Sequence, residues 1–214
     1  PYKLATSPND NGGWFSSLKN AGLLDLIHEN GIEWLNVFAV DNVLQRIADP
    51  CFVGATITEN RSVGAKVVCK NHPDEKVGVM CLKDNHPSIV EYYELTPELR
   101  DAVDEDGEPA YNFGVILNYL FKESELEDIC ENTLPLHIVE KKIPYIDDAG
   151  TLIKPEEPNG YKFETLILDM IQMMDTCLPF EVERDKEFAP IKNKTGIDSV
   201  ESARALLAKN GVTL

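Results

Sequence analysis

Residues 14–42 read WFSSLKNAGLLDLIHENGIEWLNVFAVDN and contain the two patterns on which the expected fold rests. Apolar residues recur at helical spacing over 14–30, and Asn30-Gly31 is a typical helix end, so a helix is expected there. The apolar run that follows stops at Asp41 and predicts a buried strand of the kind common in parallel sheets. A helix followed by a buried strand is typical of an α/β sheet.

Further along the chain, short segments rich in β-branched residues alternate with turn signals. Strands or extended segments are expected at 55–60, 64–70, 77–84, 88–95, 111–121, 141–147 and 179–185. Helices are expected at 96–108, 123–132, 163–177 and 199–211. The first of these helices should be short and run into an acidic loop. The alternation predicts one α/β unit of three layers with a mixed sheet and an inserted β-meander.

Charge and composition exclude some classes of partner. The chain of 214 residues carries 20 Lys and Arg against 37 Asp and Glu, a net charge of −17. Nucleic-acid backbones and anionic membranes favour basic surfaces, so neither is an expected partner. No apolar run has the length of a membrane helix and none resembles a signal peptide, which favours a soluble, cytoplasmic protein.

The cysteines and histidines form no recognisable disulfide or metal pattern. The count of five cysteines is odd, no CxxC pair occurs, and the four histidines are scattered without an HxH or HExxH spacing. We therefore expect reduced thiols in a cytosolic protein, without a disulfide framework, a zinc knuckle or a transition-metal site.

Two polar positions lie beside predicted elements. Asn11 precedes Gly12-Gly13 at the start of the first helix, where backbone N–H groups favour anions or sugar hydroxyls, although an ordinary turn gives the same pattern. Asp41 follows the carboxyl end of a buried strand, where ligands bind in open α/β sheets. Asp41 could hold a Mg²⁺ ion that bridges phosphates. Equally, it could be the N-cap residue of a short helix at 43–47.

Other candidates lie later in the chain. Glu91 and Tyr92 fall on a predicted strand, where a carboxylate facing a cavity could bind sugar hydroxyls; a solvated sheet edge gives the same pattern. Lysine ammonium groups suit phosphate oxygens, which adds Lys141, Lys142, Lys154, Lys162 and Lys192. Lys162 is the more specific candidate because it follows the turn at 158–160 and should open the next helix.

Several of these segments occur together, and in the same order, in one protein family. The chain resembles eukaryotic UDP-N-acetylglucosamine pyrophosphorylases in the strings NDNGGWFSSL (9–18), VFAVDNVLQRIADPCFVG (37–54), GAKVV (64–68), VEYYE (90–94), YNFG (111–114), KKIPYID (141–147), KPEEPNGYKFE (154–164) and EFAPIKN (187–193). The similarity extends over roughly Pro8 to Ala205. It implies a Rossmann-like nucleotidyltransferase fold that converts UTP and N-acetylglucosamine 1-phosphate into UDP-N-acetylglucosamine and pyrophosphate with Mg²⁺.

The resemblance also implies which residues bind the sugar. Asn11 matches a residue that contacts the sugar, and Gly64 matches a glycine close to the N-acetylhexosamine. Glu91 and Tyr92 match the substrate-binding Glu-Tyr pair of the family.

A second set of matches implies which residues meet the nucleotide. Asp10 is the neighbour of the sugar-contacting Asn11 and occupies a position that lies against the nucleotide, so it is also an expected substrate-binding residue. Asp41 matches an aspartate near the phosphates, which makes it the expected Mg²⁺ ligand. Lys162 and Lys192 match lysines that reach the phosphates, and they are the expected catalytic residues.

The sequence departs from the family's pattern at several points. The family usually has glycine where this chain has Asp10, and asparagine where it has Val115. A UDP-glucose or broader UDP-sugar pyrophosphorylase is therefore an alternative, since Val115 removes one hydrogen bond to the sugar. The family's glycine-rich LxGGxGTRLG loop occurs nowhere in residues 1–214.

Residues 1–214 are accordingly expected to form the second half of the nucleotidyltransferase catalytic domain. The glycine-rich nucleotide-binding half and a C-terminal domain would lie outside this sequence, and the piece alone should be inactive. Its expected protein partner is the missing half or another copy of the chain. A non-catalytic module that binds a sugar nucleotide or supports assembly is an alternative of another class.

Overall fold

The structure, a computed structural model, describes residues 6, 9–130 and 132–213. The helices are α1 (Trp14–Asn20), α2 (Leu24–Glu29), α3 (Pro50–Thr58), α4 (Pro97–Arg100), α5 (Glu123–Ile129), α6 (Ile167–Gln172), α7 (Arg184–Glu187) and α8 (Val200–Lys209). The strands are β1 (Trp34–Phe38), β2 (Val63–Cys69), β3 (Val79–Lys83), β4 (His86–Val90), β5 (Phe113–Lys122), β6 (His137–Lys141), β7 (Tyr145–Ile146), β8 (Leu152–Ile153), β9 (Gly160–Glu164) and β10 (Cys177–Glu181). No helix within these residues is both long and apolar enough to cross a membrane.

The main sheet is built around β5. Its strand order is β10-β2-β5-β3-β4, and β1 pairs with β5 outside this path. The β10–β2 pair is parallel, whereas β5 pairs antiparallel with β1, β2 and β3. Strand β3 also pairs antiparallel with β4, so these two strands form a hairpin at the sheet edge; the expected β-meander is not formed, because β5 pairs with β3 and not with β4. The prediction of a mixed α/β sheet is confirmed.

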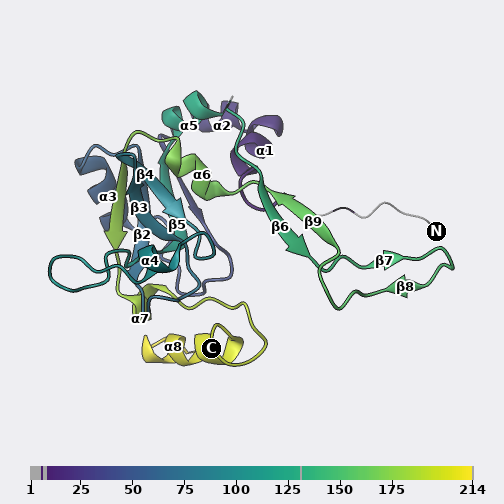
Figure 1. The fold of residues 1–214 in the computed structure, drawn as a ribbon. Helices are drawn as coiled ribbons and strands as arrows, with labels where there is room; N and C mark the ends of the chain where they lie inside the picture. Colours follow the sequence, from purple (N-terminus) through teal and green to yellow (C-terminus); the bar gives the residue numbers. More distant parts are fainter. Residues whose placement is uncertain (1–5, 7–8, 131, 214) are drawn as a thin grey trace.

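Helices cover both faces of this sheet, with α3 on one side and α6 on the other (Figure 1). Alternate residues of β2, Val63, Ala65 and Val67, are fully buried in the core that also holds Ile171 of α6. On the other face, Gly64 lies directly against α3. Because successive side chains of a strand point to opposite faces, β2 packs against the core with one set of residues and against α3 with the other.

A buried ion cluster also holds the α3 side of the sheet. The Nζ of Lys66 on β2 lies 2.9 Å from Oδ2 of Asp49 and 2.5 Å from Oε2 of Glu187. The Lys66 side chain is 0% exposed, so these two carboxylates, rather than water, compensate its charge. The cluster ties the start of α3 to β2 and α7.

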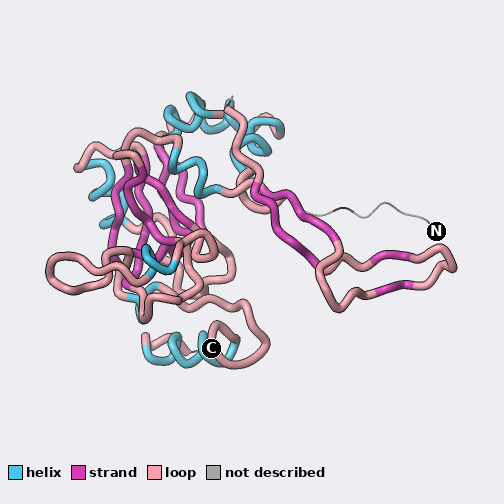
Figure 2. The backbone as a smooth tube through the Cα atoms, in the orientation of Figure 1, coloured by secondary structure: helices cyan, strands magenta, loops and turns pink. Residues whose placement is uncertain are grey.

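A hairpin arm, residues 137–164, extends away from the main sheet (Figures 1 and 2). Strands β6 and β9 pair antiparallel at its base, and β7 and β8 pair farther out. Large apolar side chains on the arm are exposed, including Ile138 at 63%, Tyr161 at 60% and Phe163 at 54%. The arm therefore offers apolar surface that the described residues do not cover.

Several expected elements differ in the structure because turn chemistry competes with apolar periodicity. The helix expected at 14–30 is divided into α1 and α2 by Gly22, whose φ of +71° suits glycine. The strand expected at 55–60 belongs to α3, which Asp49 caps by accepting the N–H of Cys51 and which has Pro50 in its first turn. Strand β1 is antiparallel and half-buried, not a buried parallel strand.

Three further expectations need correction at site residues. Strand β4 ends at Val90, so Glu91 and Tyr92 lie in the following turn rather than on a strand. The helix expected at 163–177 is only α6, and Lys162 lies on β9 instead of opening a helix. Residues 43–47 form turns and no helix, so Asp41 is not the N-cap of one.

Candidate functional site

The candidate site lies where two strands meet the same edge of β5. Strand β1 pairs with residues 118–122 of β5, and β3 pairs with Gly114. Between them Leu117 has a φ of +49°, which is rare for a bulky residue, and its carbonyl accepts the N–H of Ala39 at 2.9 Å. The chain leaves β1 and enters β3 at this point, and a crevice of the kind that binds ligands in open sheets opens between them.

Buried amides hold the backbone in this irregular conformation. Asn118 is fully buried; its Nδ2 donates to Oε1 of Gln45 at 2.8 Å, and its Oδ1 accepts from Nδ2 of Asn36 at 2.8 Å. The Nε2 of Gln45 donates to the carbonyls of Ala39 and Leu117. Because buried amides of this kind are costly to leave unpaired, the network stabilises the sheet edge beside the crevice.

The loop before α1 forms one wall. The Oδ1 of Asn11 accepts the backbone N–H of Ile167 at 2.8 Å, and the N–H of Gly12 donates to the Thr165 carbonyl at 2.9 Å. A Cβ on Gly12 would lie 2.6 Å from the backbone carbon of Thr165, so glycine is needed for this close approach. The Asn11 oxygen is occupied, which leaves its amide nitrogen as the atom able to donate to a ligand.

Asp10 adopts a backbone conformation that explains how it can replace the glycine expected from the resemblance. Its φ is +51°, a region that glycine favours and aspartate tolerates. Its Oδ1 accepts the N–H of Asn11 at 2.8 Å. The substitution therefore keeps the loop conformation and adds a carboxylate.

Backbone pairing between distant segments brings Asp41 and Lys192 together. The carbonyl of Asp41 accepts the N–H of Ile191 at 2.9 Å. The buried side chain of Asn42 accepts the N–H of Ala189 at 2.8 Å. Lys192 follows directly and is exposed, so its ammonium group reaches the same crevice as the half-buried Asp41.

The turn after β4 supplies the opposite wall. The N–H of Glu94 donates to the Glu91 carbonyl at 2.9 Å, which closes the turn that presents Glu91 and Tyr92. Gly78 lies beside it, since a Cβ there would be 3.7 Å from Oε1 of Glu91 and 3.4 Å from Cγ2 of Val115. Sequence analysis missed Gly78; its position at the start of a predicted strand was the only signal.

These residues surround one cavity of about 250 Å³. Of the expected site residues, it is lined by Asn11, Asp41, Glu91, Tyr92 and Lys192. Gly78, Val115 and the buried Tyr119 also line it. An open groove of about 660 Å³ adjoins it, shares Asn11 and Asp41, and adds Asp10.

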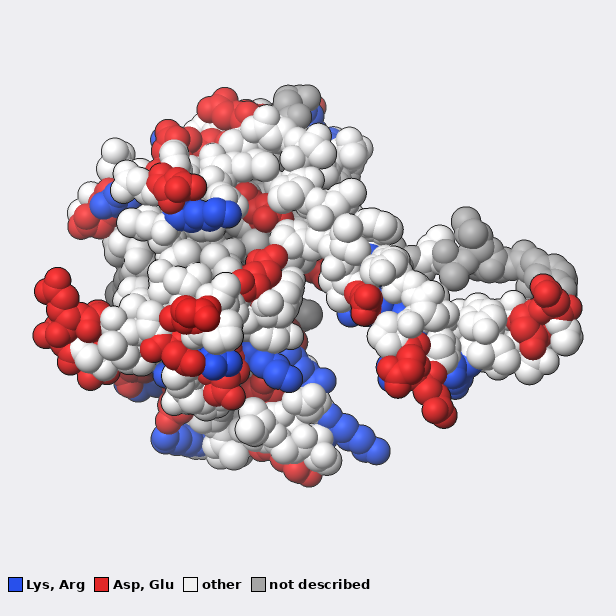
Figure 3. Space-filling view, in the orientation of Figure 1, with Lys and Arg blue, Asp and Glu red and all other residues white. Residues whose placement is uncertain are grey.

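The surroundings of the cavity perturb its ionisable groups. Burial, followed by the neighbouring Glu94, raises the pKa of Glu91, while His137 and Lys192 oppose the rise. Burial and then the charge of Glu91 raise the pKa of Tyr93 to about 12. Acidic side chains are spread over the body and arm (Figure 3), so Lys192 supplies positive charge in a largely negative setting.

Gly64 and Lys162 do not line the cavity. A Cβ on Gly64 would lie 2.5 Å from Oγ1 of Thr56, which places Gly64 against α3 on the face opposite the cavity. Lys162 lies on the arm and forms an ion pair with Glu164 of the same strand. Gly64 is therefore separated from the other expected sugar-binding residues.

The groove contains donors suited to a hard cation. Asp10 and Asp41 both line it, and carboxylate oxygens combine with phosphate oxygens and water around Mg²⁺. Two carboxylates cannot complete an octahedral shell, so water and phosphate oxygens of a bound nucleotide would supply the remaining ligands. The residues present fit a Mg²⁺ ion that arrives with phosphate.

Comparison with known proteins agrees with this geometry. A protein from Mus musculus named UDP-N-acetylhexosamine pyrophosphorylase-like protein 1 is 40% identical over 214 residues, 97% of this chain and 42% of its own length. A UDP-N-acetylglucosamine pyrophosphorylase from Saccharomyces cerevisiae is 37% identical over 224 residues, 100% of this chain and 46% of its own length. The chain thus spans less than half of these relatives.

The fold is also found in solved structures. The crystal structure of an Entamoeba histolytica protein named for the same activity as the yeast relative has a TM-score of 0.87 and 34% identity, over 95% of this chain and 51% of that one. A family described as UTP–glucose-1-phosphate uridylyltransferase matches residues 2–213. The chain belongs to this uridylyltransferase family, UDPGP.

Proposed function

We propose that this chain is the sugar-binding part of an enzyme that makes UDP-N-acetylglucosamine and pyrophosphate from UTP and N-acetylglucosamine 1-phosphate. The observation that carries the proposal is the cavity, where Asn11, Asp41, Glu91, Tyr92 and Lys192 converge from separate segments. The similarity to the yeast pyrophosphorylase supports the choice of substrates.

The proposed reaction is a direct displacement. A phosphate oxygen of the sugar 1-phosphate attacks the α-phosphorus of UTP, forming a new P–O bond, and pyrophosphate leaves with the electrons of the bond that breaks. The attacking phosphate is already ionised near neutral pH, so no general base is required. The tasks of the protein are then positioning and charge neutralisation.

Individual residues have distinct parts in this proposal. The ammonium group of Lys192 neutralises charge on the phosphates, and Asp41 would hold Mg²⁺, which aligns the phosphates and reduces their charge. Glu91, Tyr92 and the amide nitrogen of Asn11 orient the sugar. Burial raises the pKa of Glu91, and its carboxyl oxygens can accept hydrogen bonds from sugar hydroxyls.

Three predicted residues have less structural support. Lys162 stays a predicted phosphate ligand, a role in which phosphate would replace its present partner Glu164. Asp10 stays a predicted neighbour of the nucleotide, on the groove side of the cavity. Gly64 packs against α3 and does not line the cavity, so Gly78 takes that role in our proposal.

A glucose 1-phosphate substrate is the alternative, favoured by one observation. Val115 lines the cavity beside Gly78 and offers no hydrogen bond, which reduces the polar contacts available to an N-acetyl group. Losing one such contact changes discrimination by about 0.5–1.5 kcal/mol, which leaves both sugars open to competition. Turnover measured with the two sugar phosphates separates them.

Two further expectations complete the proposal. Exposed apolar side chains on the arm, such as Tyr161 and Phe163, support packing against the additional polypeptide that the longer relatives contain. The odd number of cysteines and the lack of a CxxC pair support a reducing compartment and hence the cytoplasm.

The test uses the protein that contains this chain together with the remaining region of its relatives. Lys192→Ala should lower the rate of pyrophosphate release by about 10²-fold, as expected when a charge that stabilises the transition state is removed. Lys194→Ala is the matched control, because Lys194 is an exposed lysine that does not line the cavity. Equal rates for both variants would contradict the proposed role of the cavity.

A further inference from the structure

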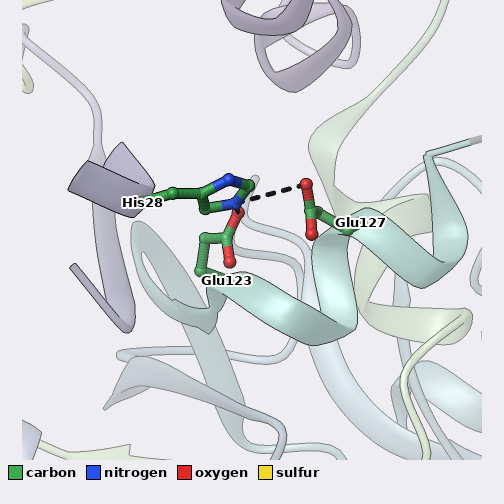
Figure 4. Close-up of side chains that lie close together, drawn as sticks. All are labelled: His28, Glu123 and Glu127. Carbon is green, nitrogen blue, oxygen red and sulfur yellow. Dashed lines mark hydrogen bonds and ion pairs between the residues drawn. The ribbon is translucent and has the colours of Figure 1, made fainter. Parts of the chain in front are cut away.

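Away from the proposed active site, one histidine and two glutamates converge between α2 and α5 (Figure 4). The Nε2 of His28 lies 3.2 Å from Oε1 of Glu123 and 3.4 Å from Oε1 of Glu127. The three candidate ligand atoms lie within 4.8 Å of one another. Among the described residues, no other three His, Cys, Asp or Glu side chains bring their ligand atoms this close together.

The three side chains extend from well-anchored backbone. Ile27 beside His28 is 6% exposed, and Leu126 beside Glu127 is fully buried. Each helix is therefore anchored by a buried apolar residue next to one of the three side chains. The N–H of Glu123 donates to the Glu33 carbonyl at 2.8 Å, directly after β5 ends. Core packing and sheet pairing therefore set the separation of the ligand atoms.

A hydrogen bond explains only part of this arrangement. Nε2 of an imidazole carries at most one hydrogen, yet two carboxylate oxygens face it. Its 3.4 Å distance from Oε1 of Glu127 is long for a charge-assisted N–H···O bond, which is usually about 2.7–2.9 Å. Within the described part of the chain, the ion pairs of Glu123 and Glu127 are with His28 alone, so the two acidic charges meet at most one positive charge.

The two N···O distances match the edges of a tetrahedral metal site, and the third separation is within 4.8 Å. Zn²⁺ binds His nitrogen and carboxylate oxygen at about 2.0–2.2 Å, and a tetrahedron with such bonds has edges of about 3.3–3.6 Å. The two measured N···O distances, 3.2 Å and 3.4 Å, are close to that edge length. Imidazole together with carboxylate is a ligand set that suits zinc better than Mg²⁺.

We propose that His28, Glu123 and Glu127 bind Zn²⁺, with water in the fourth position, and that the ion ties α2 to α5. The side chains of His28 and Glu127 are 49% and 39% exposed, which leaves an open approach for the ion and for water. Glu123, at 9%, forms the inner wall of the site. Residues 28 and 123 are 95 positions apart, which is why the spacing of histidines in the sequence predicts no such site.

The test titrates ZnCl₂ into the 214-residue chain under reducing conditions, with binding followed by calorimetry and the thermal midpoint by circular dichroism. Wild-type protein should bind one Zn²⁺ and melt at a higher temperature when it is bound. His28→Gln and Glu127→Gln change exposed side chains and should each weaken binding about tenfold or more, while the metal-free spectra stay unchanged.

Two controls separate this site from other zinc ligands. His72→Gln alters another exposed histidine, whose Nδ1 lies 2.7 Å from Oδ1 of Asp74 without a third ligand, and it should leave Zn²⁺ affinity unchanged. Chain alkylated at its cysteines should still bind Zn²⁺. Absence of Zn²⁺ binding by the wild type, binding that survives both His28→Gln and Glu127→Gln, or loss of binding on alkylation would each overturn the proposal.

Discussion

The Nε2 of His137, at the base of the arm, lies 2.9 Å from Oδ2 of Asp169 in α6. On the other side of the ring, Nδ1 lies 3.8 Å from Oε1 of Glu94, in the turn that presents Glu91 to the cavity. One imidazole therefore links the arm, a core helix and the candidate substrate turn. His137 was not among the residues that the sequence singled out.

The Asp169–His137 contact predicts a specific pH dependence. Burial raises the pKa of Asp169 above its ordinary value of 3.8, against the opposing effect of His137. The folded state therefore holds the proton of the Asp169 carboxyl more tightly than the unfolded state does. The stability that this protonation contributes is present below pH 3.8 and is lost as pH rises through the folded pKa. Asparagine cannot ionise, so the Asp169→Asn variant does not lose this stability. The free energy of unfolding of the variant minus that of the wild type should therefore rise as pH increases through the folded pKa of Asp169.

Urea unfolding at a series of pH values measures this difference. Asp175→Asn is the control, because Asp175 is an exposed aspartate close to the same helix. A relative stability of Asp169→Asn that stays constant or falls with increasing pH would contradict the expected direction.

Gly12 and Gly13 provide a matched pair for the loop wall. Gly12→Ala places a methyl group 2.6 Å from the backbone carbon of Thr165 and should lower the free energy of unfolding by roughly 1–3 kcal/mol, the usual cost of overpacking. Gly13→Ala meets nothing closer than the Ser16 hydroxyl at 3.9 Å and should change stability little. Denaturant melts of the two variants check this, and equal losses would show that the loop does not pack as described.

The buried ion cluster makes a prediction about stability. Lys66→Met keeps much of the side-chain volume but takes away the buried cation between Asp49 and Glu187 and leaves Arg46, 3.5 Å from Oε1 of Glu187, as the nearby positive charge, so unfolding should become easier by about 3–5 kcal/mol. Lys83→Met changes an exposed lysine on β3 and should alter stability by less than about 0.5 kcal/mol. A Lys66→Met protein with wild-type midpoint in urea would mean that the cluster is not a net support of the fold.

Gly78 tests the cavity wall. In Gly78→Ala the new methyl group would lie 3.0 Å from Cγ2 of Ile89 and 3.7 Å from Oε1 of Glu91, so the wall around Gly78 must shift to accommodate it. We expect KM for the sugar 1-phosphate to rise about tenfold, equivalent to about 1.4 kcal/mol. Gly54→Ala, which meets nothing within 4 Å on α3, should leave KM unchanged. A KM that does not respond to Gly78→Ala would place the sugar elsewhere.

Parts of the fold were predictable because several local signals agreed. Helix α8 has Ser199 as a capping-box residue at its start and Gly211 with φ of +78° just beyond its end, and the sequence predicted it at 199–211. Residues 55–60 show the opposite case. Their β-branched Thr56, Ile57 and Thr58 favoured a strand, whereas the Asp49-Pro50 start continued into α3, and packing of Phe52 and Thr56 against the sheet decided the outcome.

The candidate site was predictable mainly through the resemblance. Asn11, Asp41 and Lys192 each had an ordinary local explanation, and only the cavity brings them together. Contacts such as Gln45 with Asn118 depend on residues 73 positions apart, which no local pattern encodes. Gly64 and Gly78 show where prediction from sequence ends. Either glycine could allow a ligand to approach the backbone closely, and only the structure shows that Gly64 faces α3 whereas Gly78 lies beside Glu91.

The position of the cavity at the interrupted edge of β5 has a consequence for how substrate preference can change over evolution. Residues 115–117 and Tyr119 of β5 line one side of the cavity, in a stretch held by Asn118 and Gln45, and Gly78 lines another part of the wall. If the proposed function holds, position 115 is a place where sugar preference can change, and a substitution there must also keep the packing of Val115 against the core.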